Sequence, residues 1–274
     1  DKINGMFAFV LYDKKENCVY LFRDRLGIKP IFFYSDGSKI MFSSEIKPLI
    51  SSNLFPKEIN YDALSSYLSF RFNYGVGNFF KNINSVEPGE YVKMSANGIS
   101  NHTYWEYPFN HEKFHLSEKK LIENCEELIS EVTSEHLVSD VPVGSLLSGG
   151  LDSSLLTVMM DKVSNGKINT FSASFDDKDY DENKFSKIVS NQVKSNHFNI
   201  ILNSQDYQNN LGKVISHAAT PLSIPHEIAL NSLFQKISKH SKVVISGEGA
   251  DEMFGGYGRV QSSGFDYKKI KFVK

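Results

Sequence analysis

The sequence predicts two domains of different fold class: an antiparallel, β-rich α+β domain at residues 1–110 and an α/β domain at residues 111–274. The first prediction rests on short apolar runs joined by tight turns, which are typical of hairpins. The second rests on apolar strands that alternate with helical segments, a pattern that indicates a parallel, doubly wound sheet. Around residues 106–116 the apolar pattern lapses, and we place the domain boundary there.

Tight turns define the strands of the first domain. Apolar runs that flank polar turns occupy residues 5–13, 18–22, 31–34 and 40–42. The turn between residues 34 and 40 contains Asp36-Gly37, which favours a hairpin because glycine tolerates the positive φ that such a turn needs. We expect an antiparallel meander of at least four strands, a short helix at residues 61–70 and a further strand after a turn at residues 86–91.

Strands and helices alternate along the second domain. Strands are expected at residues 143–147, 168–175, 197–202 and 242–245. Helices are expected after Ser117, a suitable N-cap, and at residues 153–163, 181–193, 205–217 and 226–239. The apolar face of the first helix contains Cys125, which favours a core position for this thiol over a catalytic one. In the third helix, Phe185, Ile188 and Val189 are expected to point inward.

The composition excludes several classes of partner. A formal net charge of −2 gives no electrostatic footprint for nucleic acid or an anionic membrane surface. The two cysteines do not suggest a disulfide framework, and no run approaches about eighteen consecutive apolar residues. We therefore expect a soluble, cytoplasmic protein. Because the chain starts at Asp1 and stops after Lys274 without a capping or tail signal, we also expect a fragment of a longer protein.

The first motif with chemical significance is a glycine-rich turn between a strand and a helix. Its sequence is Leu147-Ser148-Gly149-Gly150-Leu151-Asp152-Ser153-Ser154. In a parallel sheet, ligands bind beyond the carboxyl ends of strands, where the next helix presents unpaired N–H groups. The glycines permit close approach of a phosphate, and the serines can donate hydrogen bonds to it. Asp152 would repel a bare phosphate, so its presence indicates a hard cation such as Mg²⁺ between them.

This turn differs from two common nucleotide-binding loops. It lacks the lysine and the spacing of a Walker A loop, and it lacks the G-x-G-x-x-G pattern of dinucleotide-binding proteins. A Gly-Gly turn with incidental serines is the simpler alternative.

A second motif follows the expected strand at residues 242–245. It is the segment Ser246-Gly247-Glu248-Gly249-Ala250-Asp251-Glu252-Met253-Phe254-Gly255-Gly256-Tyr257. Three carboxylates within five positions are costly to gather at a strand end unless a metal ion or a polar ligand neutralises them. The alternative is a flexible acidic loop. This alternative is disfavoured because the segment follows a strand of the same sheet as the first motif.

Together the two motifs resemble the synthetase domain of the asparagine synthetase B family, within the N-type ATP pyrophosphatases. Residues 136–144, 171–175 and 180–182 are also similar to this family, and residues 5–9, 23–30 and 44–47 are similar to the latter part of its glutaminase domain. The resemblance covers nearly the whole chain. It implies an adenine-nucleotide-hydrolase-like parallel sheet, preceded by the remnant of an N-terminal-nucleophile glutaminase (type 2 amidotransferase) domain.

The resemblance also implies the roles of individual residues. Phosphate binding is implied for Ser148, Gly149, Gly150, Ser153 and Ser154, and magnesium binding for Asp152 and Asp251. The main chain of three residues would border the adenine and ribose of ATP: Leu147, Ala173 and Gly247. Ser246 and Tyr257 would line the same pocket. Glu248 would lie beside the reaction centre, where it steers or deprotonates the incoming ammonia.

The implied activity is that of a ligase that amidates aspartate with nitrogen from glutamine. The aspartate side chain attacks the α-phosphorus of ATP, and Mg²⁺ stabilises the departing pyrophosphate. Ammonia then attacks the aspartyl-adenylate to give asparagine and AMP. The implied partners are the small molecules aspartate, glutamine and ATP, with neither nucleic acid nor membrane, and a homodimer is left open.

Three departures from the family pattern limit this implication. The family nucleophile is an N-terminal cysteine, whereas this chain starts with Asp1 and Cys18 lies inside an expected strand. The family residues that hold glutamine, and a phosphate-binding lysine, lie outside the matched segment. We therefore expect residues 1–274 alone to be inactive. Residues 219–227 are atypical near the acceptor pocket, and we interpret His226 there as a helix-start residue.

Other functions remain open at this point. One is a related amidotransferase that acts on a different carboxylate, in surface-sugar or secondary-metabolite biosynthesis. Another is a non-catalytic nucleotide-binding module, although Asp152, Glu248 and Asp251 are all present. Transfer-RNA thiolation would call for a basic surface and reactive cysteines, which the composition does not offer.

Overall fold

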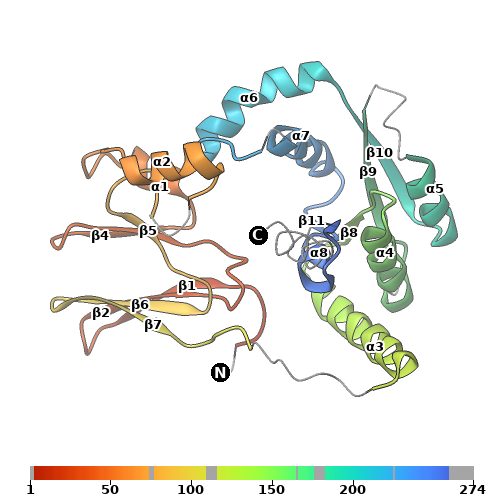
Figure 1. Ribbon diagram of the computed structural model, residues 1–274, viewed down its shortest axis with the longest axis horizontal. Helices are drawn as coiled ribbons and strands as arrows, with labels where there is room; N and C mark the ends of the chain where they lie inside the picture. The colour runs from red at the N-terminus through yellow and green to blue at the C-terminus, as the bar shows by residue number, and fades with distance from the viewer. Residues whose placement is uncertain are drawn as a thin grey trace, which may run out of the picture. The chain divides into compact units, whose positions relative to one another are not determined.

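The computed structural model describes residues 3–73, 77–108, 116–164, 166–175, 183–224 and 226–258. Its contacts divide the chain into two compact units (Figure 1). The first unit holds the described residues up to 113 together with residues 211–227, and the second holds the described residues of 114–210 and from 228 onward. Helix α6 (Ser204–Ala218) therefore contributes to both units.

Two antiparallel sheets form the first unit. The four-stranded sheet has the order β1-β2-β6-β7, with β1 Ala8–Asp13, β2 Cys18–Arg23, β6 Glu90–Ser95 and β7 Gly98–Thr103. The three-stranded sheet has the order β4-β3-β5, with β3 Phe32–Ser35, β4 Ile40–Ser43 and β5 Ile83–Ser85. Both expected hairpins are confirmed. A single meander is wrong, because β2 pairs with β6 and β3 with β5, strands that are distant in sequence.

The two sheets pack face to face, and helices cover the outer face of the smaller sheet (Figure 1). Side chains alternate across β3, so Phe33 joins the core between the sheets while Tyr34 packs against Leu49 of α1 (Ile46–Ser51). The helix expected at residues 61–70 is confirmed as α2 (Tyr61–Phe70). It starts there because the side chain of Asn60 accepts hydrogen bonds from the first-turn amides.

A buried carboxylate organises the loop that follows β2. Asp24 is only 1% exposed. Its two oxygens accept hydrogen bonds from the amides of Phe7, Leu26, Ile28 and Lys29, at 3.3, 3.2, 2.9 and 2.9 Å. Burial by itself raises the pKa of Asp24, but the four amide donors outweigh burial and hold that pKa below its ordinary value. The loop is therefore folded around a permanent negative charge.

A four-stranded parallel sheet with the order β10-β9-β8-β11 is the core of the second unit. Its strands are β8 Val143–Leu146, β9 Asn169–Phe175, β10 Asn196–Leu202 and β11 Val243–Ile245. The remaining helices are α3 Glu118–His136, α4 Leu151–Val163, α5 Asn183–Gln192, α7 His226–Ile237 and α8 Ala250–Phe254. The expected α/β fold with a parallel sheet is thus confirmed. Within the described residues, no helix combines the length and the apolar character needed to cross a bilayer.

Helices lie on both faces of this sheet. On one face, Phe171 and Leu202 pack against Leu233 of α7. On the other face, Ile168 packs against Met160 of α4, and α5 contacts β9 and β10. The sheet is therefore wound in both directions, as the alternation of strands and helices predicts.

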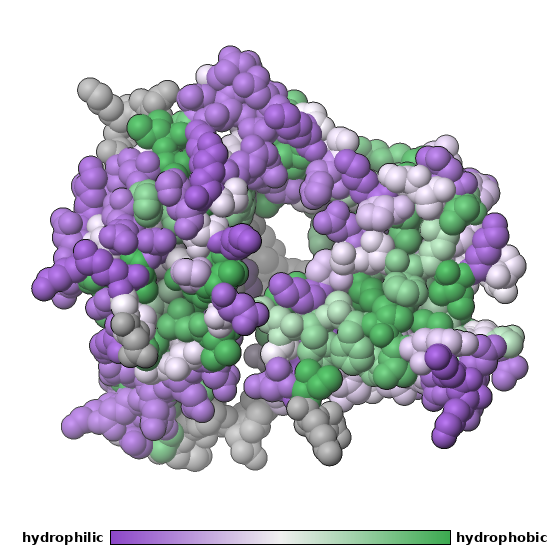
Figure 2. All heavy atoms as spheres, turned by 180° about the vertical axis from the view of Figure 1, so that it is seen from behind, coloured by the Kyte–Doolittle hydropathy of each residue, from purple (hydrophilic) through white to green (hydrophobic). Residues whose placement is uncertain are grey.

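The expected core position of Cys125 is wrong. The N-cap of α3 is confirmed, since the Ser117 hydroxyl accepts a hydrogen bond from the amide of Lys120 at 3.3 Å. Cys125, however, is exposed together with Ile122 and Leu128 on the same helix. Figure 2 shows that hydrophobic and hydrophilic side chains both form extended areas on the face drawn. Helical periodicity identified an apolar face, but not whether a neighbouring element covers it.

The inward orientation expected for Phe185 and Ile188 of α5 is also wrong, whereas Val189 is half-buried. Phe185 and Ile188 are 49% and 63% exposed, and the buried residues of this helix are Asn183, Ser186 and Ser190. The sheet face beneath α5 explains this, because β9 directs the buried hydroxyls of Thr170, Ser172 and Ser174 toward that side. The polar side of α5 faces this polar row of the sheet, and the hydrophobic side faces outward.

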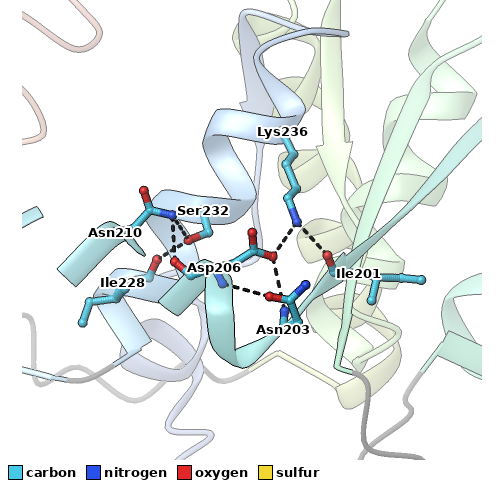
Figure 3. A network of polar contacts seen from close by, with 7 residues as sticks. All are labelled: Ile201, Asn203, Asp206, Asn210, Ile228, Ser232 and Lys236. Carbon is cyan, nitrogen blue, oxygen red and sulfur yellow. Dashed lines mark hydrogen bonds and ion pairs between the residues drawn. The ribbon is translucent and has the colours of Figure 1, made fainter. Parts of the chain in front are cut away.

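A polar network joins the start of α6 to α7 and to the end of β10 (Figure 3). Asn203 and Asp206 cap each other, since the side chain of each accepts a hydrogen bond from the amide of the other at 2.8 and 3.3 Å. The ammonium group of Lys236 donates to the Asp206 carboxylate at 2.7 Å and to the carbonyl of Ile201 at 2.8 Å. This bond to Lys236 is the main reason why the pKa of Asp206 lies below its ordinary value.

Replacing Lys236 with methionine is expected to lower stability at pH 7 and to have less effect at pH 3. Because the folded-state pKa of Asp206 is lowered, its contribution is present above about pH 4 and is lost as the pH falls through the folded value. Urea unfolding at both pH values measures the difference. Lys239→Met, a change of an exposed lysine on the same segment, is the control. An equal loss of stability at both pH values would show that methionine acts through packing alone.

Candidate functional site

The two motifs follow neighbouring parallel strands. Strand β11 pairs with β8 so that Val243 lies opposite Val143 and Ile245 opposite Ser145. Parallel strands have their carboxyl ends at the same edge of a sheet, so both glycine-bearing segments start side by side. In the order β10-β9-β8-β11, β8 is also the strand at which the winding direction reverses. Such a switch point is where open α/β sheets form their ligand-binding crevice.

The turn after β8 is held in shape by its own serines. The amide of Gly150, the N-cap of α4, donates to the hydroxyl of Ser148 at 3.2 Å. The hydroxyls of Ser148 and Ser153 lie 2.9 Å apart, and Ser153 also donates to the carbonyl of Gly150 at 3.2 Å. These bonds fix the direction of the first turn of α4, whose leading N–H groups have no acceptor within the helix.

Gly149 meets a steric requirement that no other residue satisfies. Its φ is +91°, which L side chains rarely adopt. A Cβ at this position would lie 2.8 Å from the Cβ of Phe185 and 2.9 Å from the amide nitrogen of Ser186. The start of α5 therefore packs directly on the turn. The exposed aromatic residue Phe185, for which the sequence predicts a place inside the fold, is one of its supports.

The two motifs are in direct contact through Gly247. A Cβ at Gly247 would lie 3.1 Å from the amide nitrogen of Ser153 and 3.2 Å from the Cβ of Asp152. A side chain at this position would be tightly crowded, so glycine favours the close approach of the second segment to the first turn of α4. The structure thus brings together two sequence motifs that are almost one hundred residues apart.

Carboxylates gather in the segment after β11. The hydroxyl of Tyr257 donates to the Glu252 carboxylate at 2.6 Å. This bond is the first cause of the raised pKa of Tyr257, and the nearby charges of Asp251 and Glu248 raise it further. The same bond lowers the pKa of Glu252. Three negative charges are therefore close enough to act on one phenol, an arrangement that favours a cationic ligand.

Asp251 is half-buried beneath a glycine turn. It is the second residue of α8, and its main-chain carbonyl accepts a hydrogen bond from the amide of Gly256 at 3.0 Å. Its carboxylate lies against Gly256, where a Cβ would overlap with it. Glu248 lies on the loop before α8 and is exposed. Gly256 therefore leaves room for the Asp251 side chain.

The other candidate residues lie around this core of the site. Leu147 is buried, and its amide donates to the carbonyl of Phe171 at 2.7 Å. Ser154 is half-buried in the first turn of α4, and Ser246 directly follows β11. Ala173 packs in the hydrophobic cluster beneath α7. The described contacts do not join the Ala173 side chain to either loop, so a role for this residue rests on its main chain.

Two carboxylates, Asp152 and Asp251, are the candidates for a metal ion. Asp152 is exposed in the first turn of α4, and Asp251 is offered by the adjoining segment. Among the residues that the structure describes, no group of three or more histidine, cysteine, aspartate or glutamate side chains is placed to hold a metal ion. Mg²⁺ fits this donor set, because it commonly takes one or two carboxylates and completes its shell with phosphate oxygens and water.

Sequence analysis missed the support behind the turn. Ser145 on β8 and Thr157 on α4 are 1% and 0% exposed, and their hydroxyls lie 2.8 Å apart. The available signal was a serine within an apolar strand and a threonine one helical turn after Ser153. Neither residue stands out without knowledge of which helix face meets the strand.

Two families match the chain in succession. The family described as asparagine synthase matches residues 124–269, and the family described as glutamine amidotransferase domain matches residues 1–105. Asparagine synthetase 1 (glutamine-hydrolyzing) of Bacillus subtilis is 34% identical over 93% of this chain and 40% of its own length. Asparagine synthetase 3 (glutamine-hydrolyzing) of the same organism is 29% identical over 94% of this chain and 44% of its own length. The chain thus spans less than half of these relatives.

Similarity to solved structures is weaker. A glutamine-dependent NAD⁺ synthetase from Acinetobacter baumannii in complex with adenosine diphosphate has a TM-score of 0.39 at 13% identity. The match covers 92% of this chain and 61% of that one, and similarity at this level supports no functional argument. The asparagine synthase match, in contrast, covers more than half of the chain and both motifs of the site. The chain therefore belongs to the asparagine synthase family.

Proposed function

We propose that this chain belongs to a protein that amidates aspartate to asparagine, with ATP as the energy source and glutamine as the nitrogen donor. The reaction passes through a β-aspartyl-adenylate and releases AMP and pyrophosphate. One observation carries the proposal. The glycine-rich turn at residues 147–154 (the phosphate-type turn) and the carboxylate-rich segment at residues 246–257 touch each other at the switch point of a parallel sheet. An ATP–metal complex needs both a cradle for phosphates and carboxylates for the metal, side by side.

We assign the residues of the site as follows. The turn around Ser148, Gly149, Gly150, Ser153 and Ser154 holds the phosphates, chiefly through amides at the start of α4. Asp152 and Asp251 would hold Mg²⁺, and the bound ion would supply charge neutralisation at the phosphates. Leu147, Ala173 and Gly247 border the nucleoside by their main chain, with Ser246 and Tyr257 in the same pocket. Glu248, exposed beside these carboxylates, orients ammonia toward the acyl carbon.

The chemistry of the chain's own groups fits this assignment. The first-turn amides of α4 and the helix dipole favour negative charge at the turn. Ser153 is buried and its hydroxyl is bonded within the turn, so its side chain shapes the cradle. A site that encloses the adenylate also keeps water from hydrolysing it before ammonia arrives.

The remaining parts of the proposal concern the longer protein. Residues 1–110 form part of a glutaminase domain of the N-terminal-nucleophile type, and residues 111–274 form part of the synthetase domain; the glutamine amidotransferase match supports the first assignment. The partners are aspartate, glutamine and ATP, with a cytoplasmic location, no nucleic acid and a homodimer as an open option. Biosynthetic relatives support the location.

An assay of product stoichiometry tests the proposal. The purified full-length protein, of which this chain is a part, is incubated with ATP, Mg²⁺ and aspartate, with either glutamine or ammonium as the nitrogen source. We expect asparagine and pyrophosphate in equal amounts, and no pyrophosphate when aspartate is omitted. Ammonium bypasses the glutaminase reaction, so it tests the synthetase site by itself. Pyrophosphate release that does not depend on aspartate would refute aspartate as the acceptor and favour another carboxylate.

A further inference from the structure

A buried pair of hydroxyls connects the sheet to the helix that carries the turn. Ser145 on β8 and Thr157 on α4 are almost fully buried, with their oxygens 2.8 Å apart. The Thr157 hydroxyl donates to the carbonyl of Ser153 at 2.7 Å, which uses its only hydrogen. Ser145 must therefore donate to Thr157. The hydrogen bonds run in one direction, from the strand to the helix.

The same residue, Ser153, ends this chain of bonds and begins the next. Its carbonyl accepts from Thr157, while its hydroxyl donates to Gly150 and lies 2.9 Å from the hydroxyl of Ser148. A continuous series of bonds thus leads from β8 through α4 into the phosphate-type turn. A change in the height of α4 above the sheet would move Ser153, and with it the turn.

Two hydrophobic side chains would fill this position without the free-energy cost of burying polar groups. The presence of two hydroxyls therefore points to a role other than packing. The neighbouring contacts of α4 with the sheet are apolar, through Met160 and Val158. A buried hydroxyl is tolerated when it is bonded, but apolar contacts allow sliding whereas a hydrogen bond fixes both distance and direction. A threonine hydroxyl inside a helix is commonly satisfied by a carbonyl of the preceding helical turn alone. Thr157 has, in addition, a partner on the strand, the hydroxyl of Ser145.

We propose that Thr157, held by Ser145, is a positioning residue for ATP: it fixes the first turn of α4 at the height at which its amides meet the phosphates. The inference rests on the proposed function, since it presupposes that the turn binds ATP. Thr157 lies one helical turn behind the ligand and does not touch it. Its removal should therefore weaken ATP binding without removing any group that contacts ATP.

Three variants separate positioning from stability. Thr157→Val has nearly the same shape but lacks the hydroxyl, and it leaves Ser145 buried without its partner. Thr157→Ser keeps the hydroxyl. The double variant Ser145→Ala/Thr157→Val removes both hydroxyls, so no unsatisfied group remains, and thermal stability should largely recover. The connection between strand and helix is still missing in the double variant.

Equilibrium binding of ATP with Mg²⁺ to the purified proteins, at a temperature at which all are folded, gives the decisive readout. We expect Thr157→Val to raise the Kd for ATP about tenfold, the effect of one lost hydrogen bond. Thr157→Ser should stay within about twofold, and the double variant should bind as weakly as Thr157→Val despite its recovered stability. Affinity that recovers together with stability, or that never changes, overturns the inference. If the unchanged protein binds no ATP, the proposed function fails as well.

Discussion

Replacing either Asp152 or Asp251 with asparagine is expected to slow the release of pyrophosphate from ATP by about a hundredfold or more, because a catalytic metal ion supplies several kcal/mol of charge stabilisation. Asparagine has the same shape but offers a neutral oxygen, which is a poorer ligand for a hard cation. The two residues lie on segments that touch through Gly247, so loss of either side should weaken the same ion.

The dependence on Mg²⁺ distinguishes a lost ligand from a damaged fold. Both variants should need a higher concentration of Mg²⁺ for half-maximal activity. Their thermal unfolding should change little, since one acidic side chain in a first helical turn contributes only about 0.3 to 1 kcal/mol. Asp161→Asn is a matched control, because Asp161 is exposed on the same helix α4 but lies near its far end. Unchanged pyrophosphate release by Asp152→Asn and Asp251→Asn would refute the assignment of the metal site.

The local elements of this fold could be predicted from the sequence because their signals are local. The helix expected at residues 61–70 matches the bounds of α2, and Asp36-Gly37 predicted the β3–β4 hairpin. The turn at Gly149 was predictable for the same reason, since a left-handed backbone conformation between a strand and a helix requires glycine. Chemistry that depends on one short segment can be inferred from that segment.

Pairing between distant segments could not be predicted in the same way. No periodicity in β2 indicates that its partner is β6, more than sixty residues later, and the expected meander was wrong for this reason. The adjacency of β8 and β11, on which the site depends, has the same non-local origin. It was suggested by the chemistry of the two motifs together rather than by any pattern within the strands.

Helix orientation shows a second limit. The spacing of Phe185, Ile188 and Val189 correctly indicated that α5 has an apolar and a polar side, but the side toward the sheet is the polar one. The reason lies on β9 and β10, where Ser172 bonds to both His197 and Asn199 and forms part of a polar row. The burial of a helix face depends on its partner, and that partner was specified by residues elsewhere in the chain.

Replacing Asp24 with asparagine is expected to destabilise the first unit by about 3 kcal/mol at pH 7, since buried donors that lose their acceptor cost about 1 to 3 kcal/mol each. The carboxylate accepts hydrogen bonds from four amides, two on each oxygen. Asparagine retains one accepting oxygen and turns an NH₂ group toward the other two amides. Those two amides then face donors instead of an acceptor in a site closed to water.

The pH dependence of the same variant gives an independent check on this cause. The folded-state pKa of Asp24 lies below its ordinary value of 3.8, so its stabilising effect is present above that value and is lost as the pH falls through the folded value. The unchanged protein should lose this contribution below about pH 4, whereas Asp24→Asn has no such group to protonate. The difference between the two proteins should therefore shrink in acid.

Chemical unfolding at pH 7 and pH 3, followed by the fluorescence of Trp105 in the same unit, measures both effects. Asp62→Asn, at an exposed position in the first turn of α2, is the control and should change stability by less than about 1 kcal/mol. If Asp24→Asn instead unfolded at the same denaturant concentration as the unchanged protein at pH 7, the four amides would have to find other acceptors. The loop between β2 and β3 would then be held by the three hydrogen bonds that the Arg23 side chain donates to main-chain carbonyls, which the substitution leaves in place.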